Sequence, residues 1–231
     1  METLQNVLFV APVLLFSVIA HEYAHGYAAL RQGDSTALAM GRLTWNPLKH
    51  IDPVLTILMP LVMGIASNWR VMLGGAKPVP VNPANYRNLR RGDIIVSLAG
   101  VATNGIIAIG ATILIALLGL FDRVAPFMHE TVAILQVMMI YAILINLFLI
   151  LFNLMPIPPL DGSHVMKYLL PGRLAIWYQQ LARFGFLILI ALISFGQGAL
   201  EVWMRPAYIA FSLLFGTVDG LVLPRAHELF G

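Results

Sequence analysis

Two histidines and a glutamate interrupt the first apolar run of the sequence, in the segment His21-Glu22-Tyr23-Ala24-His25. On a helix, residues four apart lie one above the other on the same face, so both imidazoles can reach one metal ion. Glu22 is then placed to take a proton from a water molecule that the metal polarises. Polar groups inside a membrane-length apolar helix are costly unless they are paired, which makes them candidates for function. The alternative is that this segment is only the polar end of the helix, where His and Glu meet lipid headgroups.

A second group of candidate residues follows the fourth apolar run, in the segment Asn-Leu-Met-Pro-Ile-Pro-Pro-Leu-Asp-Gly from Asn153 to Gly162. Proline lacks an N–H donor and breaks helices, so Asp161 is expected on irregular backbone at or near the membrane. A catalytic zinc takes three protein ligands and keeps a fourth position for water. Because the chain has no cysteine, such ligands must be His and carboxylate. Asp161 would be the third ligand, and the alternative for Asp161-Gly162 is a plain turn.

The composition of the whole chain indicates a membrane protein. Of its 231 residues, 59% are hydrophobic and only 11% are charged, and the mean hydropathy is +0.84. A soluble domain would carry about 25% charged residues. The net charge of +3 comes from Lys and Arg placed between the apolar runs. That pattern orients membrane spans and does not indicate a nucleic-acid interface.

Six apolar runs predict an all-α polytopic membrane protein with about five to six transmembrane helices. They cover about residues 7–30, 51–67, 94–121, 131–155, 174–195 and 207–223. Crossing the hydrocarbon core takes about 20 helical residues. The first, third, fourth and fifth runs meet this length, the sixth is marginal, and the second is short and contains Pro60. We expect one membrane domain, with a core at 5–172 and accessory helices at 173–231.

The connections between the runs carry two further predictions. Residues 31–50 combine a Gly33-Asp34 turn signal with alternating apolar residues, which favours a small hairpin or pair of strands. Residues 74–93 begin with several prolines and glycines, which favours extended, irregular backbone.

Bringing Asp161 to the depth of His21 and His25 requires that the second run does not cross the membrane and is instead re-entrant. This threading also puts most of the basic residues on the cytoplasmic side, as the positive-inside rule predicts. The basic residues assigned to that side are Arg31, Arg42, Lys49, Arg70, Lys77, Arg87, Arg90, Arg91, Lys167, Arg173 and Arg225.

Together, the HEYAH and NLMPIPPLDG segments closely resemble the site-2 proteases, intramembrane zinc metalloproteases of peptidase family M50. WNPLKHIDP and GGAKPVPVNP add similarity to the small prokaryotic branch without PDZ or CBS domains. The resemblance implies one Zn²⁺ per chain held by His21, His25 and Asp161, with Glu22 as the general base. It also implies a transmembrane protein or peptide as substrate, a prokaryotic cell membrane as location, and an active site towards the cytoplasmic half.

The resemblance extends to substrate binding. Family members carry an Ala-Gly-Pro-x-x-Asn segment that helps to bind the substrate backbone. Here the segment reads Ala99-Gly100-Val101-Ala102-Thr103-Asn104, with Val101 in place of the proline. Asn104 is therefore a candidate substrate-binding residue. Apart from this segment, Asn153 and Asn146 could also form hydrogen bonds to a substrate, or could instead join helices.

Two other functions are compatible with these residues. A catalytically silent adaptor that binds transmembrane helices would have the same fold and no need of zinc. A metal or proton transporter would also place His and Asp inside the membrane, but it would usually offer several polar stations along its helices. No residue identifies a particular substrate, and the oligomeric state is open.

Overall fold

The computed structural model describes residues 2–58, 61, 65 and 75–230, and among these residues it contains helices and turns but no strand. Four helical segments are long and apolar enough to cross a membrane: Val7–Gln32, Leu89–Val124, Pro126–Asn153 and Gly172–Phe195. They correspond to the first, third, fourth and fifth apolar runs. The prediction of an all-α polytopic membrane protein is therefore confirmed.

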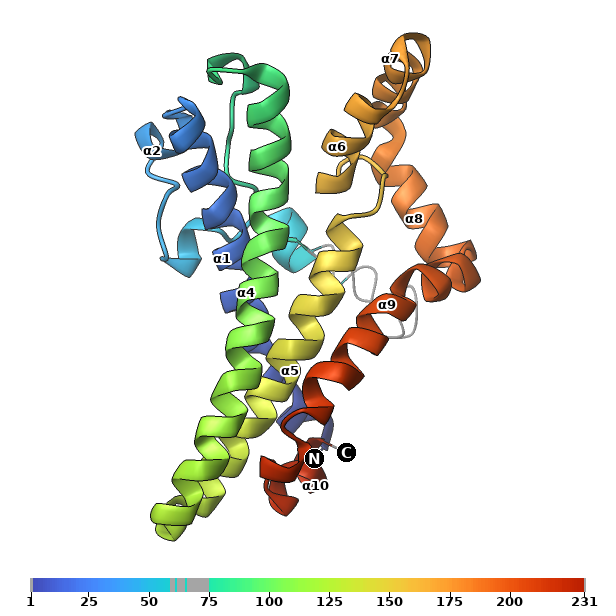
Figure 1. Cartoon of the computed structure of the whole chain (residues 1–231). Helices are drawn as coiled ribbons and strands as arrows, with labels where there is room; N and C mark the ends of the chain where they lie inside the picture. Colours follow the sequence, from blue (N-terminus) through green and yellow to red (C-terminus); the bar gives the residue numbers. More distant parts are fainter. Residues whose placement is uncertain (1, 59–60, 62–64, 66–74, 231) are drawn as a thin grey trace. The chain divides into compact units, whose positions relative to one another are not determined.

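The long helices differ in how continuous they are (Figure 1). α1 (Glu2–Gln32) contains Pro12 and still continues past the HEYAH segment, and α4 (Leu89–Val124) is unbroken over 36 residues. A 3-10 turn, Pro126–Met128, connects α4 to α5 (His129–Asn153). The fifth run is divided into α7 (Gly172–Leu181), a 3-10 turn at Ala182–Phe184 and α8 (Gly185–Phe195).

The second and sixth runs are less regular. Of the second run, the structure describes residues 51–58, with a π-helical turn at Pro53–Leu58, together with 61 and 65. The rest of that run, on which the re-entrant prediction depends, lies outside the described residues. The sixth run falls in α9 (Gln197–Gly216) and a 3-10 turn at Asp219–Leu221, followed by α10 (Pro224–Phe230). α9 carries Glu201 and Arg205 and is not among the four candidate spans.

The strands predicted after α1 do not form. Residues 33–50 instead contain the short helix α2 (Thr36–Ala39) and a 3-10 turn at Pro47–Lys49. The cause is local side-chain bonding: Asp34 Oδ1 accepts the backbone N–H of Thr36 at 3.1 Å, and Asn46 Oδ1 accepts that of Leu48 at 3.0 Å. Asp and Asn side chains that capture nearby N–H groups favour turns over strand pairing.

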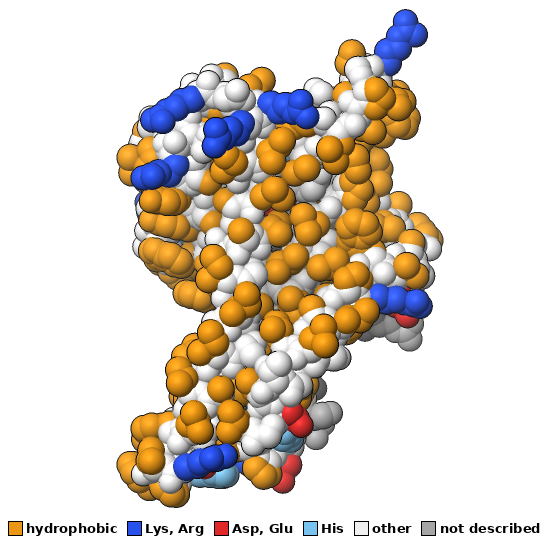
Figure 2. All heavy atoms as spheres, in the orientation of Figure 1, with side chains coloured by type: hydrophobic (Ala, Val, Ile, Leu, Met, Phe, Trp, Pro, Cys, Tyr) orange, Lys and Arg blue, Asp and Glu red, His pale blue; other side chains and the backbone are white. Residues whose placement is uncertain are grey.

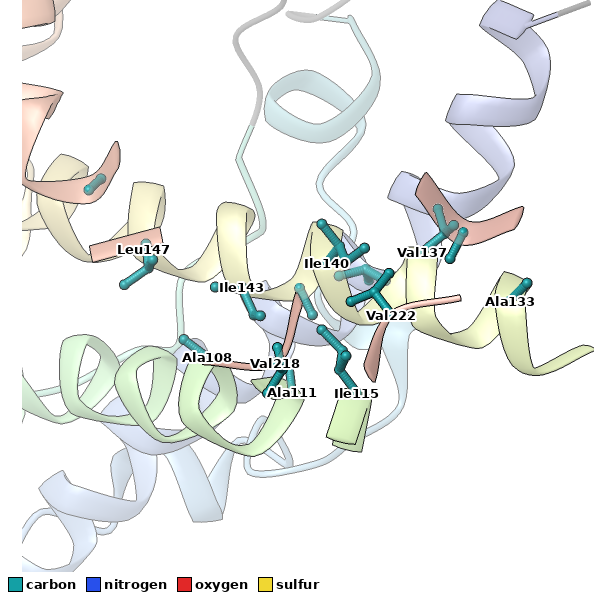
Figure 3. Close-up of a cluster of buried hydrophobic side chains, with 14 residues drawn as sticks. Ala108, Ala111, Ile115, Ala133, Val137, Ile140, Ile143, Leu147, Val218 and Val222 are labelled. Carbon is teal, nitrogen blue, oxygen red and sulfur yellow. The ribbon is translucent and has the colours of Figure 1, made fainter. Parts of the chain in front are cut away.

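The chain folds into two compact units, residues 1–17 with 101–231, and residues 18–100. In the first unit, α5 packs against α9 and α10. Its buried core consists of side chains of α5 with others from α4 and from the end of the chain (Figure 3). The core members labelled in Figure 3 are Ala108, Ala111, Ile115, Ala133, Val137, Ile140, Ile143, Leu147, Val218 and Val222.

One polar side chain is enclosed in this apolar core. Gln136 of α5 is 0% exposed, and its amide nitrogen donates to the carbonyl oxygens of Ile115 at 3.2 Å and Leu221 at 2.9 Å. Its amide oxygen accepts the N–H of Leu223 at 2.8 Å. Gln136 thus joins α4, α5 and the segment between α9 and α10, and it satisfies backbone groups that would otherwise be buried without partners.

The second unit, residues 18–100, is built around the C-terminal half of α1. Its small apolar core contains Ala29 of α1, Val96 of α4 and Tyr86, which precedes α4. Residues 75–82, between the undescribed residues and a 3-10 turn at Pro83–Asn85, have neither helix nor strand, as the prolines predict. This unit therefore contains the HEYAH helix, the proline-rich segment and the first turns of α4.

Candidate metal centre

The two histidines of HEYAH face one another on α1. The Nε2 atoms of His21 and His25 are 2.9 Å apart, and the two rings meet edge to face. His25 Nδ1 lies 2.7 Å from the carbonyl oxygen of Val96 on α4. Because a carbonyl oxygen can only accept, His25 Nδ1 carries the proton of this bond, and Nε2 of the neutral ring then has a lone pair directed towards His21.

His21 lies in a pocket that only a glycine permits on the facing helix. A Cβ atom at Gly100 of α4 would be 2.5 Å from both Cε1 and Nε2 of His21, which no real structure tolerates. His21 itself is only 6% exposed. The absence of a side chain at Gly100 therefore allows α4 to approach the ring and restricts how that ring can turn.

Glu22 is held by the proline-rich segment of the same unit. Its Oε2 accepts the backbone N–H of Val79 at 2.8 Å, and its side chain is partly buried. A carboxylate fixed through one oxygen presents the other in a defined direction. Glu22 is thus positioned beside the two histidines by a contact that joins residues 57 positions apart.

These two histidines fit a zinc ion. Imidazole nitrogens are preferred zinc ligands, and two of them at this separation can share either a proton or a cation. Metal-binding histidines usually donate their second ring N–H to a carbonyl or carboxylate, as His25 does to Val96. The donor set and its supporting bond therefore suit a metal.

Asp161 is the first residue of α6 (Asp161–Leu169), in the other compact unit. The prediction that Asp161 lies on irregular backbone is wrong: the irregular backbone is confined to Leu154–Leu160, and the helix begins at Asp161. A Cβ at Gly162 would be 2.2 Å from the carbonyl oxygen of Leu154. Glycine at this position lets the proline-rich turn fold back onto the first turn of α6, and Asp161 takes its place from that turn.

The candidate substrate-binding asparagines differ in their surroundings. Asn104 of α4 is 0% exposed, and within the described part of the chain neither of its amide atoms has a hydrogen-bond partner. Asn153 donates to the carbonyl oxygen of Leu149 on its own helix at 3.0 Å. Asn146 donates to Ser17 Oγ at 2.8 Å and so joins α5 to α1, which is the helix-joining alternative. The buried, unpaired amide makes Asn104 the stronger candidate.

Sequence reasoning missed the residues that support HEYAH. The segment from Ala99 to Asn104 indicates a role for Asn104, but the sequence alone does not show the space that Gly100 leaves for His21. The bond from Val79 to Glu22 had a weak signal: Val79 lies between Pro78 and Pro80, and it is therefore the only N–H donor of that tripeptide. The carbonyl of Val96 gave no signal, because a backbone acceptor can belong to any residue type.

Comparison with known proteins places the chain in a family. The model of peptidase family M50 matches residues 9–194. The Bacillus subtilis (strain 168) protein "Putative zinc metalloprotease YwhC" is 36% identical over 192 residues, which are 82% of this chain and 82% of that protein. The Rip2 protein of Mycolicibacterium smegmatis, named likewise, is 31% identical over 78% of this chain and 64% of its own length.

A further relative covers less of the chain, and solved structures were also compared. Rip2 of Mycobacterium tuberculosis (strain Erdman) is 31% identical over 66% of this chain and 54% of its own length. No solved structure matches this chain significantly. A family match over most of the chain, together with a relative at 36% identity, shows that the chain belongs to peptidase family M50 and is a metalloendopeptidase.

Proposed function

We propose that this chain is an intramembrane zinc metalloendopeptidase that hydrolyses peptide bonds in or near the transmembrane segments of other membrane proteins. One observation carries the proposal: His21, Glu22 and His25 lie within Val7–Gln32, a helix apolar and long enough to cross a membrane. Charged and polar side chains at such a depth are expensive, and hence functional by default. A soluble peptidase would have no reason to place them there.

In this proposal His21, His25 and Asp161 hold the zinc ion. The set provides two neutral imidazoles and one carboxylate, which neutralises one of the two positive charges and leaves a position for water. When bound, zinc polarises the scissile carbonyl and lowers the pKa of water to about 7. The fixed rotamers of His21, against Gly100, and of His25, bonded to Val96, support their part of the site.

Glu22 is the proposed general base and general acid. Its carboxylate takes a proton from the attacking water as the new C–O bond forms at the scissile carbonyl carbon. It then gives this proton to the amine nitrogen as the C–N bond breaks, so that the products are a carboxyl end and an amine end. The N–H of Val79 holds Oε2 throughout and keeps the carboxylate beside the histidines.

The substrate must unwind locally, because a transmembrane helix hydrogen-bonds its own carbonyls. Asn104 can supply the substrate backbone with hydrogen bonds in place of those that are lost, since its buried amide has none of its own in the described structure. Asn153 would serve the same purpose less directly. The cytoplasmic half of a prokaryotic cell membrane remains the proposed location, from the distribution of Lys and Arg.

The experiment compares purified wild type and Glu22→Gln with a single-span membrane protein in detergent or liposomes. We expect Glu22→Gln to reduce the cleavage rate by roughly 10²–10⁴-fold, the usual contribution of a general base, while the bound zinc is unchanged. Glu201→Gln, at an exposed position of α9, is the matched control and should cleave normally. Undiminished cleavage by Glu22→Gln would refute the mechanism. A zinc-loaded wild type that binds the span without cleaving it would favour the adaptor alternative.

A further inference from the structure

Arg42 is a buried cation that the proposed mechanism does not use. It lies three residues after the end of helix α2 and is 8% exposed. Its Nη2 donates to the carbonyl oxygens of Lys77 at 2.8 Å and Pro78 at 3.3 Å. Burying a guanidinium is costly, so an arginine at this position requires a compensating role.

The carbonyls that Arg42 binds are adjacent to the N–H that binds Glu22. Val79 follows Pro78 directly, its N–H donates to Glu22 Oε2, and its side chain is buried against α1. A Cβ at Gly26 of α1 would be 2.8 Å from Val79 Cγ1, so the segment approaches α1 one residue after His25. Because the preceding carbonyl belongs to the same peptide unit as the Val79 N–H, holding Pro78 O fixes the direction of that N–H.

The proline-rich segment from Lys77 to Asn82 is also held by hydrogen bonds at both ends. At its start, the N–H of Lys77 donates to the carbonyl oxygen of His50 at 2.8 Å. At its end, Asp34 Oδ2 accepts the N–H of Asn82 at 2.7 Å, and Oδ1 accepts Asn85 Nδ2 at 2.8 Å. Hydrogen bonds therefore hold the backbone on both sides of the Pro78–Val79 peptide. Arg42 is the side chain that fixes the rotation of this peptide plane.

From this geometry we propose that Arg42 is a positioning residue for Glu22, acting through the Pro78–Val79 peptide. The proposal deepens the proposed function, on which its kinetic part rests. The hydrogen bonds of Arg42 go to the carbonyls of Lys77 and Pro78, and the Val79 N–H beside them binds Glu22, so Arg42 orients the N–H that orients the carboxylate. Its loss should slow the chemical step without removing the metal or weakening substrate binding.

The test uses the full chain with three substitutions. Arg42→Met keeps much of the side-chain volume but removes the donors, and Arg42→Lys retains a cation that can still reach a carbonyl. Arg31→Met, at an exposed position of the same unit, is the matched control. Amide hydrogen exchange of the fragment from Lys77 to Val81 reports on the network directly, because Pro78 and Pro80 leave only three backbone amides in it.

We expect Arg42→Met to speed exchange at Val79 by roughly tenfold or more, as a lost local constraint does, and Arg31→Met to leave it unchanged. With the single-span substrate, kcat should fall by roughly tenfold or more while KM and zinc content stay close to wild type, because only a transition-state interaction is lost. Arg42→Lys should recover part of both effects. Glu22→Ala should also speed exchange at Val79, and this result needs no catalytic activity.

Two results would overturn the proposal: unchanged Val79 exchange in Arg42→Met, or a raised KM with normal kcat, which would assign Arg42 to substrate binding. The proposed function fails in a different way. If the wild type cleaves no membrane protein while Val79 exchange still responds to Arg42→Met and Glu22→Ala, the peptidase reaction is rejected and the Arg42–Val79–Glu22 linkage stands.

Discussion

At the scale of single residues, the position of His21 depends on the missing side chain of Gly100. Because a Cβ there would be 2.5 Å from the His21 ring, Gly100→Ala must displace either the ring or α4. We expect this substitution to weaken zinc binding by roughly 10- to 100-fold, as other changes next to metal ligands do. Equilibrium dialysis against a competing chelator measures the affinity.

Gly105→Ala is the control for this substitution on the same helix. A Cβ at Gly105 would meet only Ile150 Cδ1, at an ordinary 3.8 Å. It should bind zinc like the wild type, and the gain in helix propensity is worth up to about 1 kcal/mol of stability. Equal zinc affinity in the two alanine variants would show that Gly100 does not position His21.

Asp34 connects stability to pH. Burial raises the pKa of its carboxyl, but hydrogen bonds from Asn82, Thr36 and Asn85 together lower it, and the net pKa lies below the ordinary value. A carboxyl whose pKa is lower in the folded state stabilises the protein above its ordinary pKa of about 4, and this stabilisation is lost as the pH falls towards the folded-state value.

We therefore expect Asp34→Asn to cost about 1–3 kcal/mol of unfolding free energy at pH 7. An amide nitrogen would replace one carboxylate oxygen and face either the N–H of Asn82 or that of Thr36, which leaves that donor without an acceptor. The difference from wild type should shrink as the pH falls below about 4 towards the lowered folded-state pKa of Asp34, where the wild-type carboxyl is protonated. Thermal unfolding in detergent, followed by tryptophan fluorescence across this pH range, measures both. A difference that does not depend on pH would contradict the assignment.

At the scale of elements, apolar run length predicted the long helices well. Each of the four candidate spans coincides with a run that has enough residues to cross a bilayer, because backbone groups in lipid must be satisfied within a helix. The HEYAH spacing likewise predicted two facing imidazoles, which α1 provides. The length of an apolar run and the spacing of residues along one helix depend on neighbouring residues only, so both can be read from the sequence.

The prediction of a pair of strands was wrong because it considered only the alternation of apolar residues. Alternating apolar residues after α1 indicated strands, but Asp34 and Asn46 bond to N–H groups two residues ahead and divert the backbone into turns. The support of HEYAH was equally hard to predict. Val79 and Val96 act through backbone atoms that are 57 and 71 positions from their partners, and side-chain type says nothing about such contacts.

Gln136 is a contact between elements whose loss should lower stability. Replacing it with leucine would leave the half-buried N–H of Leu223 and carbonyl of Leu221 without this partner. We expect Gln136→Leu to cost about 1–3 kcal/mol of unfolding free energy. Gln179→Leu, at an exposed position on α7, should have little effect, and thermal unfolding of both variants decides. Equal stability would show that the Gln136 bonds contribute nothing net.

At the scale of the whole molecule, apolar side chains cover much of the visible surface, and Lys and Arg are gathered in few places (Figure 2). Among the described residues of the unit 18–100, six basic residues are exposed: Arg31, Lys49, Lys77, Arg87, Arg90 and Arg91. Each acidic residue that the structure describes in this unit is buried or half-buried. This asymmetry supports the proposal that the polar end of the unit faces the anionic cytoplasmic leaflet.

The relation between the two distant motifs also belongs to this scale. HEYAH lies in one compact unit and Asp161 in the other, and the sequence connects them through the ligand number of a catalytic zinc, the membrane threading and the resemblance to site-2 proteases. The helix that each motif occupies could be predicted from local pattern. That the two motifs form one site is a prediction about tertiary structure. The coordination of one metal ion by residues of both motifs is the property that tests it.

The measurement that tests this account most directly is the zinc content per purified chain, for wild type, His21→Ala and Asp161→Ala. Asp219→Ala, at an exposed position near the C-terminus, is the control. We expect about one zinc in wild type and control, as a site with three protein ligands requires, and loss or marked weakening of zinc binding in both ligand variants. Folded wild type that takes up no zinc when it is supplied would contradict the metalloprotease mechanism. Full zinc in Asp161→Ala would contradict the third ligand and the threading that depends on it.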